Sequence, residues 1–222
     1  AGDATEAVPR LCAMRDRSTA FTVDLLGETV LSEREAEDYA ARYLDLVNVL
    51  ANAAAEWPIV PRLDRDDRGA IPSVNISVKV SSLFSQIKPE APRYSIDQLA
   101  RRLRPLLRQA IARHVFINLD MEMYSLKELT LRLFMSLLNE EEFRQYPHFG
   151  IAMQTYLRET PEDLDRLIAW CAKRGTRVTV RLVKGAYWDT ETITARQQIW
   201  PSPVYESKEE TDAAYERLAL RL

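Results

Sequence analysis

The sequence predicts an α/β fold built from parallel strands and covering helices. Short apolar or β-branched runs alternate with helical stretches five times along 222 residues, as is typical of parallel strands joined by helical crossovers. Each predicted strand also ends in polar residues, which is expected where ligands bind at the carboxyl ends of parallel strands. We therefore expect one α/β domain over residues 21–222, preceded by a linker or tail at 1–20 that has no hydrophobic periodicity.

The glycines distinguish between the parallel α/β folds. The chain has 6 glycines, and none are spaced as in G-x-G-x-x-G or a phosphate-binding loop, which argues against a dinucleotide-binding domain. A (β/α)8 barrel of the TIM type fits better, although a full barrel needs about 250 residues and eight units. Because only about the first five βα units are present, we expect a partial barrel that is truncated on its C-terminal side.

The strand and helix boundaries follow from residue patterns. The predicted strands cover 21–26, 74–80, 115–120 and 150–156, with a fifth that runs from 177 into the stretch 181–189. Helix starts are predicted from capping residues at Ser32 with Glu35, Ser95 with Gln98, Ser125 with Glu128, Thr160 with Pro161, and Ser207 with Glu210. Loops are expected at 58–72 and 200–205. Pro105 predicts a kink or restart, and the last helix is expected to be still running at Leu222.

Composition excludes some classes of function. A net charge of −3 gives no basic face for nucleic acid, and no apolar run is long enough to span a membrane. The two cysteines, Cys12 and Cys171, lack metal or redox spacing. We expect a cytoplasmic protein, with peripheral contact at the inner face of a membrane left open. Since the chain begins at Ala1 rather than Met, we expect it to be a segment of a longer polypeptide.

Polar side chains gather at the predicted strand ends. They are Asp24 and Glu28; Lys79; Asp120 and Glu122; Gln154 and Tyr156; and Arg181, Lys184 and Tyr187. Exposure to solvent at the strand ends explains part of this set. It explains Lys79 poorly, because Val78 and Val80 flank that lysine, and an inward lysine is costly unless it is paired. We expect Asp120, on the neighbouring strand, to be its partner.

A metal site is not expected. His114 and His148 both precede strands, at the rim opposite the polar strand ends, so structural roles suit them better. Asp120 and Glu122 lie on one face of their strand and could hold magnesium, but no set of ligands for zinc is present.

Several segments carry a further, more specific signal. They are 21–28 (FTVDLLGE), 75–81 (NISVKVS), 117–122 (INLDME), 150–156 (GIAMQTY), 181–189 (RLVKGAYWD) and 203–215. Together they resemble the proline dehydrogenase family, in particular the dehydrogenase part of bifunctional proline-utilisation flavoproteins. The resemblance covers roughly residues 20–222 in order, and R-L-V-K-G-A-Y-W is its most specific motif.

The resemblance implies an enzyme. Family members are distorted (β/α)8 barrels that hold FAD at the strand ends. They oxidise L-proline to Δ1-pyrroline-5-carboxylate by hydride transfer from proline C5 to flavin N5, the first step of proline catabolism to glutamate. A membrane quinone accepts the electrons, and an aldehyde dehydrogenase domain is fused to some members.

The resemblance also implies residue roles. Asp120 and Arg181 are the expected catalytic residues, with Arg181 also contacting the flavin beside N5 and stabilising negative charge there. Lys79 is expected to hold the proline carboxylate and Tyr187 to line the substrate pocket. The other expected flavin contacts are Met121, Gln154, Val183, Lys184, Gly185, Ala186 and Trp188.

Two departures from the family pattern keep alternatives open. The stretch 205–208 differs from the T-R-K form of some members, and the family's paired arginine, which completes the carboxylate clamp, would lie beyond Leu222. We therefore expect this chain alone to bind FAD weakly and to turn over little or no proline. The alternatives are a catalytically incomplete barrel kept as a folding or interaction module, and a class I aldolase that uses Lys79 or Lys184 as a Schiff base.

Overall fold

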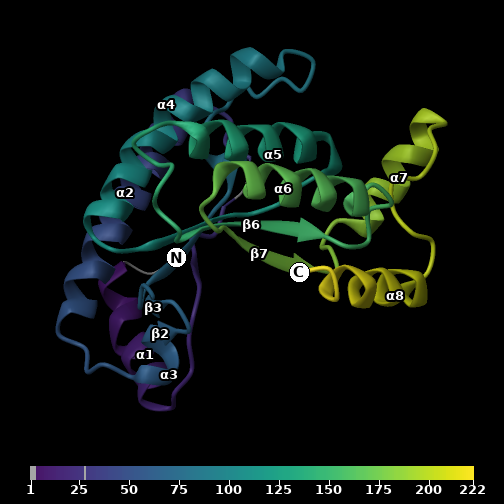
Figure 1. Cartoon of the computed structure of the whole chain (residues 1–222). Coiled ribbons are helices and arrows are strands. Elements are labelled where there is room, and N and C mark those ends of the chain that lie inside the picture. The colour runs from purple at the N-terminus through teal and green to yellow at the C-terminus, as the bar shows by residue number, and fades with distance from the viewer. Residues whose placement is uncertain (1–3, 28) are drawn as a thin grey trace. The chain divides into compact units, whose positions relative to one another are not determined.

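A computed structural model describes residues 4–27 and 29–222, so the prediction for Glu28 lies outside the described residues. Contacts within the chain divide it into two compact units, Ala1–Leu119 and Asp120–Leu222. Both units contain parallel strands and helices, which confirms the predicted α/β class (Figure 1).

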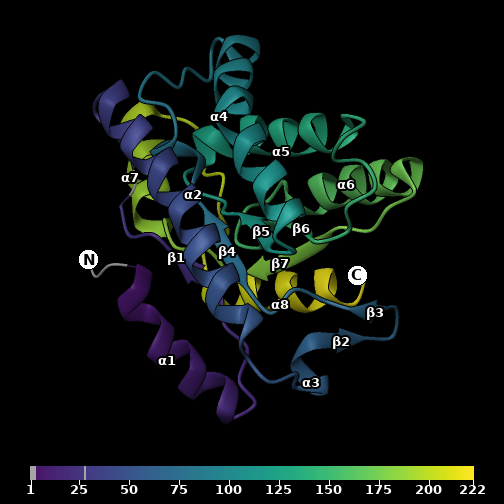
Figure 2. The ribbon, with the colours of Figure 1, turned by 90° about the vertical axis from the view of Figure 1, so that its left-hand side faces the viewer.

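The first unit is built on three parallel strands among its described residues, in the order β1, β4, β5. Its elements are α1 (Ala4–Asp16), β1 (Val23–Asp24), α2 (Glu33–Ala55), α3 (Pro61–Asp64), β2 (Arg65–Asp66), β3 (Gly69–Ala70), β4 (Asn75–Val78), a 3₁₀ turn at Val80–Ser82, α4 (Pro92–Ala112) and β5 (Phe116–Leu119). Helices α2 and α4 pack side by side (Figure 2). Tyr43 of α2 and Ile76 of β4 are fully buried in this core.

The second unit contains a parallel strand pair with helices on either side. Its elements are α5 (Tyr124–Asn139), β6 (Phe149–Gln154), α6 (Thr160–Arg174), β7 (Thr179–Val183), α7 (Trp188–Gln198) and α8 (Lys208–Ala219). Strand β6 is buried along its whole length, and its Ala152 and Gln154 stand opposite Arg181 and Val183 of β7. Helices α5 and α6 lie together over the strands, and α8 packs against β7 (Figure 1).

Some predicted helix starts are confirmed and others are wrong. Ser32 with Glu35, and Ser207 with Glu210, form complete capping boxes. Helix α4 instead begins at Pro92, because proline at the first helical position already has a helical φ. Ser95 lies within that helix, and its Oγ accepts a 2.9 Å hydrogen bond from the Lys88 N–H.

Helix α5 begins at Tyr124, directly after Met123 at the N-cap, rather than being opened by Ser125. Pro105 lies within an unbroken α4. It is exposed, so the carbonyl left without its helical partner can be hydrated. The last helix ends at Ala219.

Three further differences concern segments predicted to be irregular. Residues 4–16 form helix α1 rather than a featureless tail, although the domain boundary at 20/21 stays a prediction. The expected loop at 58–72 holds α3 and the β2–β3 hairpin. Helix α7 was not predicted, because its sequence, WDTETITARQQ, is rich in β-branched threonine and lacks a clear apolar face.

Helix α1 is held in the first unit by a buried ion pair. Arg15 is 5% and Asp64 7% exposed, and their two hydrogen bonds measure 2.7 and 2.9 Å. Arg15 also lies 5.1 Å from the centre of the Trp57 ring. Burial alone would raise the pKa of Asp64, but hydrogen bonds from Arg15, the Ser73 hydroxyl and the Val60 N–H outweigh it and lower this pKa to about 2.

This depressed pKa predicts an acid-sensitive contribution to stability. It is fully present above the unfolded carboxyl pKa, roughly 4, and is lost as pH falls toward the folded pKa. Relative to Asp64→Asn, the native carboxylate should raise the free energy of unfolding by about 2 kcal/mol at pH 6 and by almost nothing near pH 2. Urea unfolding of both proteins across this range measures the difference.

Asp67→Asn is the matched control, because Asp67 is an exposed carboxylate of the same segment. Its pH profile should follow the wild type. A constant difference between Asp64→Asn and wild type from pH 6 to pH 2 would contradict this account.

Candidate functional site

The segment Asp120–Met123 carries two of the predicted site residues. It leads directly into α5. Nη2 of Arg181, on β7, donates to Oδ1 of Asp120, so the two predicted catalytic residues form an ion pair. The Asp120 side chain is 14% and that of Arg181 38% exposed. The pair is therefore partly sheltered but accessible from solvent.

Gln154, the last residue of β6, holds the same segment and is only 2% exposed. Its Nε2 donates to the carbonyls of Met121 and Glu122 at 3.2 and 3.1 Å. These bonds fix the orientation of the amide and direct Oε1 away from them. Among the described residues no donor reaches the buried Oε1. A buried acceptor without a donor is costly, so this atom is suited to a ligand N–H.

The loop 184–187 joins β7 to α7 and approaches Tyr156 closely. Gly185 has φ +136, and a Cβ at this position would lie 2.6 Å from atoms of the Tyr156 ring. The Tyr156 N–H donates to the Lys184 carbonyl at 2.8 Å. At the start of α7, Trp188 Nε1 donates to the Tyr205 carbonyl at 2.8 Å. Position 185 therefore requires glycine, both because of its positive φ and because a Cβ would overlap the Tyr156 ring.

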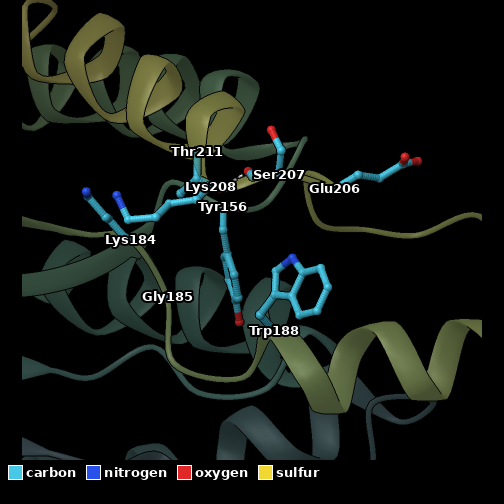
Figure 3. Close-up of a pocket in the computed structure, with 8 residues that line it drawn as sticks. All are labelled: Tyr156, Lys184, Gly185, Trp188, Glu206, Ser207, Lys208 and Thr211. Carbon is cyan, nitrogen blue, oxygen red and sulfur yellow. Dashed lines mark hydrogen bonds between the residues drawn. The ribbon is translucent and has the colours of Figure 1, made fainter.

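A pocket of about 350 Å³ opens beside this loop (Figure 3). It is lined by Tyr156, Lys184, Gly185, Trp188, Glu206, Ser207, Lys208 and Thr211. In Figure 3 the amino groups of Lys184 and Lys208 point to the same side, whereas the Glu206 carboxylate points away. The volume is within the range of small-molecule sites.

Both lysines that line the pocket pair with Asp212 of α8. Its carboxylate pairs with Lys184 at 2.5 Å and with Lys208 at 2.7 Å, and hydrogen bonds from these two lysines lower the pKa of Asp212. The ammonium groups of Lys184 and Lys208 therefore meet next to the N-terminus of α8, while Glu206 lines the same pocket and Glu209 and Glu210 lie in the first turn of that helix. Lysine ammonium groups beside a helix N-terminus are donors that a phosphate group can accept from.

Tyr156 contributes an uncharged phenol to the aromatic side of the pocket. Burial raises the pKa of the Tyr156 phenol, and the negative charge of Glu191 adds to the effect. The phenol is therefore neutral at physiological pH, and its ring stands beside Trp188 in Figure 3. These rings offer an apolar surface next to the cationic end.

Lys79 belongs to the first unit and is paired there. Its ammonium group donates to Asp24, and the Lys79 side chain is 11% exposed. Its backbone N–H donates to the Tyr43 hydroxyl at 3.3 Å. The expected Lys79–Asp120 pair involves residues of different units and stays a prediction. The roles assigned to Tyr187, Val183 and Ala186, which belong to the 181–189 stretch, also stay predictions.

Sequence reasoning missed Glu191, and it missed the charge partners of Asp212. Glu191 is 7% exposed and accepts a hydrogen bond from the Tyr124 N–H. Asp212 lies within the matched segment 203–215, but its pairing with both lysines was not foreseen. Nothing in the sequence indicated a role for Glu191, because it lies on α7, a helix that the residue pattern did not predict.

Two properties of the described chain bear on function. Across residues 4–27 and 29–222, no group of three or more His, Cys, Asp or Glu side chains is arranged to hold a metal ion. In the same residues, no helix combines the length and the apolar character that crossing a membrane requires.

Comparison with known proteins establishes the family. A sequence model described as proline dehydrogenase matches residues 7–222. The chain belongs to the proline dehydrogenase family. The solved structure of proline utilization A (PutA) from Bdellovibrio bacteriovorus inactivated by N-propargylglycine matches this chain with a TM-score of 0.97. The two sequences are 52% identical, over 99% of this chain and 23% of that one.

Other relatives are more distant in sequence. PutA from Corynebacterium freiburgense has a TM-score of 0.82 and 32% identity, over 97% of this chain and 21% of its own. The bifunctional protein PutA of Klebsiella aerogenes is 29% identical over 98% of this chain. The proline dehydrogenase of Deinococcus radiodurans is 28% identical over 100% of it. This chain spans 16% of the Klebsiella protein and 59% of the Deinococcus protein.

The Gly185 geometry predicts a specific sensitivity. Gly185→Ala combines an unfavourable φ with a clash against the buried Tyr156 ring, and should lower the free energy of unfolding by about 2–4 kcal/mol. Gly69→Ala is the matched control, because Gly69 has φ +129 but no atom within 4 Å of the place that a Cβ would occupy. Chemical denaturation should show a smaller loss for Gly69→Ala, about 1–2 kcal/mol. Equal losses would contradict the predicted clash.

Proposed function

We propose that this chain forms the flavin-binding part of an enzyme that oxidises L-proline to Δ1-pyrroline-5-carboxylate, the first step of proline catabolism to glutamate. The observation that carries the proposal is the arrangement of Arg181, Asp120 and Gln154 around one short segment, in a chain of the proline dehydrogenase family. FAD, when bound, would supply the acceptor for the hydride that leaves proline C5.

The donor and acceptor set of the second unit fits FAD. Gln154 Oε1 is a buried acceptor that suits a ring N–H of the isoalloxazine. Lys184 and Lys208 supply positive charge for the diphosphate. Tyr156 and Trp188 offer aromatic surface in the same pocket as these lysines. A ligand that is aromatic at one end and carries phosphates at the other satisfies this arrangement.

Arg181 would act by electrostatic stabilisation. Its guanidinium is held by Asp120, so its position is fixed before any ligand binds. A preorganised positive charge in a partly desolvated site stabilises negative charge that develops during hydride transfer, without the cost of reorienting solvent. Asp120 would hold the guanidinium and order the substrate side of the pocket.

The substrate contacts come from the family resemblance. Lys79 would bind the proline carboxylate through its ammonium group, and Tyr187 would line the substrate pocket. The remaining flavin contacts proposed are Met121, Val183, Gly185, Ala186 and Trp188. The ammonium group of Lys79 is held by Asp24 and its side chain is 11% exposed, so its position is restricted before a ligand binds.

The same reasoning extends to fold and partners. We infer that the parallel strands belong to a (β/α)8 barrel of which this chain supplies about the first five units. We also propose a membrane quinone as the electron acceptor, a fused aldehyde dehydrogenase domain, and a cytoplasmic location with peripheral membrane contact. The name "bifunctional" carried by the Klebsiella relative supports the fused domain.

The ion pairs of Lys79 and Lys184 argue against the aldolase alternative. A Schiff-base lysine must attack as a neutral amine. Lys79 and Lys184 are both paired with carboxylates, Asp24 and Asp212, so each amino group is already engaged rather than poised to attack a carbonyl. A catalytically incomplete barrel remains the competing proposal, and reduction of bound flavin by proline distinguishes it from the enzyme.

In the complete polypeptide with FAD bound, anaerobic addition of L-proline should bleach the flavin absorbance in a single turnover, whereas the 222-residue chain alone should show little or no bleaching. Arg181→Met should slow this reduction by roughly 100–1,000-fold, because a fixed charge in the site is lost. Stopped-flow absorbance measures both rates. Arg196→Met is the control, since Arg196 is exposed on α7.

Arg196→Met should reduce at the wild-type rate. Flavin that stays oxidised in the wild-type protein would support the incomplete barrel instead. Equal rates for Arg181→Met and wild type would contradict the role given to Arg181.

A further inference from the structure

Glu191 lies in the first turn of α7 and is buried, with 7% of its surface exposed. Its Oε1 accepts a 2.7 Å hydrogen bond from the backbone N–H of Tyr124, the first residue of α5. Its own backbone N–H donates to the Tyr187 carbonyl at 2.9 Å. Glu191 therefore joins the start of one helix to the start of another.

Helix α5 needs an acceptor from elsewhere. The first N–H groups of any helix have no partner within it, and a carboxylate near them is favourable. Met123 occupies the N-cap position and has no side-chain oxygen to accept from them. The first turn of α5 contains no acidic residue either. Glu191 provides from α7 the cap that the local sequence of α5 does not supply.

The two stretches joined in this way both carry predicted site residues. Tyr124 follows the segment that contains Asp120 and Met121. Glu191 follows the 184–188 stretch, which contains Lys184 and Gly185. A shift of α5 away from α7 would move the first set relative to the second.

Keeping the Glu191 carboxylate ionised in this buried position is unfavourable in free energy. Burial raises its pKa, and the hydrogen bond from Tyr124 offsets only part of this effect. The negative charge of Glu191 also raises the pKa values of the nearby Tyr124 and Tyr156 phenols. What the cap requires is an oxygen at this distance, so a side chain of equal length and without charge can replace it.

We propose that Glu191 is a positioning residue: by capping α5 from α7, it holds the Asp120–Met121 segment in register with the 184–188 stretch for cofactor binding. The inference rests on the proposed function, because its consequence is a change in FAD affinity. Glu191 itself contacts neither substrate nor reacting atoms in this account.

The test compares Glu191→Gln, Glu191→Asp and Glu191→Ala in the purified apoprotein. Glutamine keeps an oxygen at the same distance, whereas aspartate keeps the charge but is one methylene too short. FAD affinity is measured by quenching of flavin fluorescence, and exchange of the Tyr124 amide hydrogen by NMR. Glu35→Ala is the control, since Glu35 caps α2 in the other unit.

Alanine and aspartate should each weaken FAD binding about tenfold and speed exchange at Tyr124, because the hydrogen bond that caps α5 is lost. Glutamine should stay within about threefold of wild type in both measurements. Glu35→Ala should leave FAD affinity unchanged. Protected amides in α6 show that each variant is folded.

Two outcomes would overturn the inference alone. Faster exchange at Tyr124 with unchanged FAD affinity would make the cap purely structural, and unchanged exchange would show that the cap does not hold α5. A wild-type protein that binds no FAD would instead overturn the proposed function on which the inference rests.

Discussion

The connection between β5 and α5 must satisfy its backbone polar groups without a regular partner strand or helix, and the candidate site depends on how it does so. Gln154 of β6 binds the carbonyls of Met121 and Glu122, and Glu191 of α7 binds the N–H of Tyr124. Buried backbone groups without partners are rare because they are costly. These side chains therefore hold the segment, and with it Asp120, in one conformation.

The side chains that hydrogen-bond to this segment, and those beside it, also present polar groups to a ligand. Once both Nε2 bonds of Gln154 are made, its Oε1 is left as a buried acceptor. Arg181 is held by Asp120, and Lys184 and Lys208 both pair with Asp212. A ligand with an N–H, a developing negative charge and phosphates complements these groups. Because the chain belongs to the proline dehydrogenase family, we propose FAD as that ligand.

Much of the fold could be predicted because its signals are local. β-branched runs located the strands, and the Ser32 and Ser207 capping boxes located two helix starts. Helix α7 was missed, because its threonines give no apolar stripe. The candidate site followed from strand ends and from the family resemblance. The pairing of Lys79 with Asp24 could not be predicted from the sequence, because it depends on strand register. The role of Glu191 could not be predicted either, because it depends on the position of α7.

A crystal structure of the protein with FAD tests the central claim most directly. The account predicts Gln154 Oε1 within about 3.2 Å of a ring N–H of the cofactor, with Arg181 still paired to Asp120 at the same edge of the ring. The phosphates should lie beside Lys184 and Lys208. A flavin bound elsewhere, with Gln154 Oε1 still lacking a donor, would contradict the account.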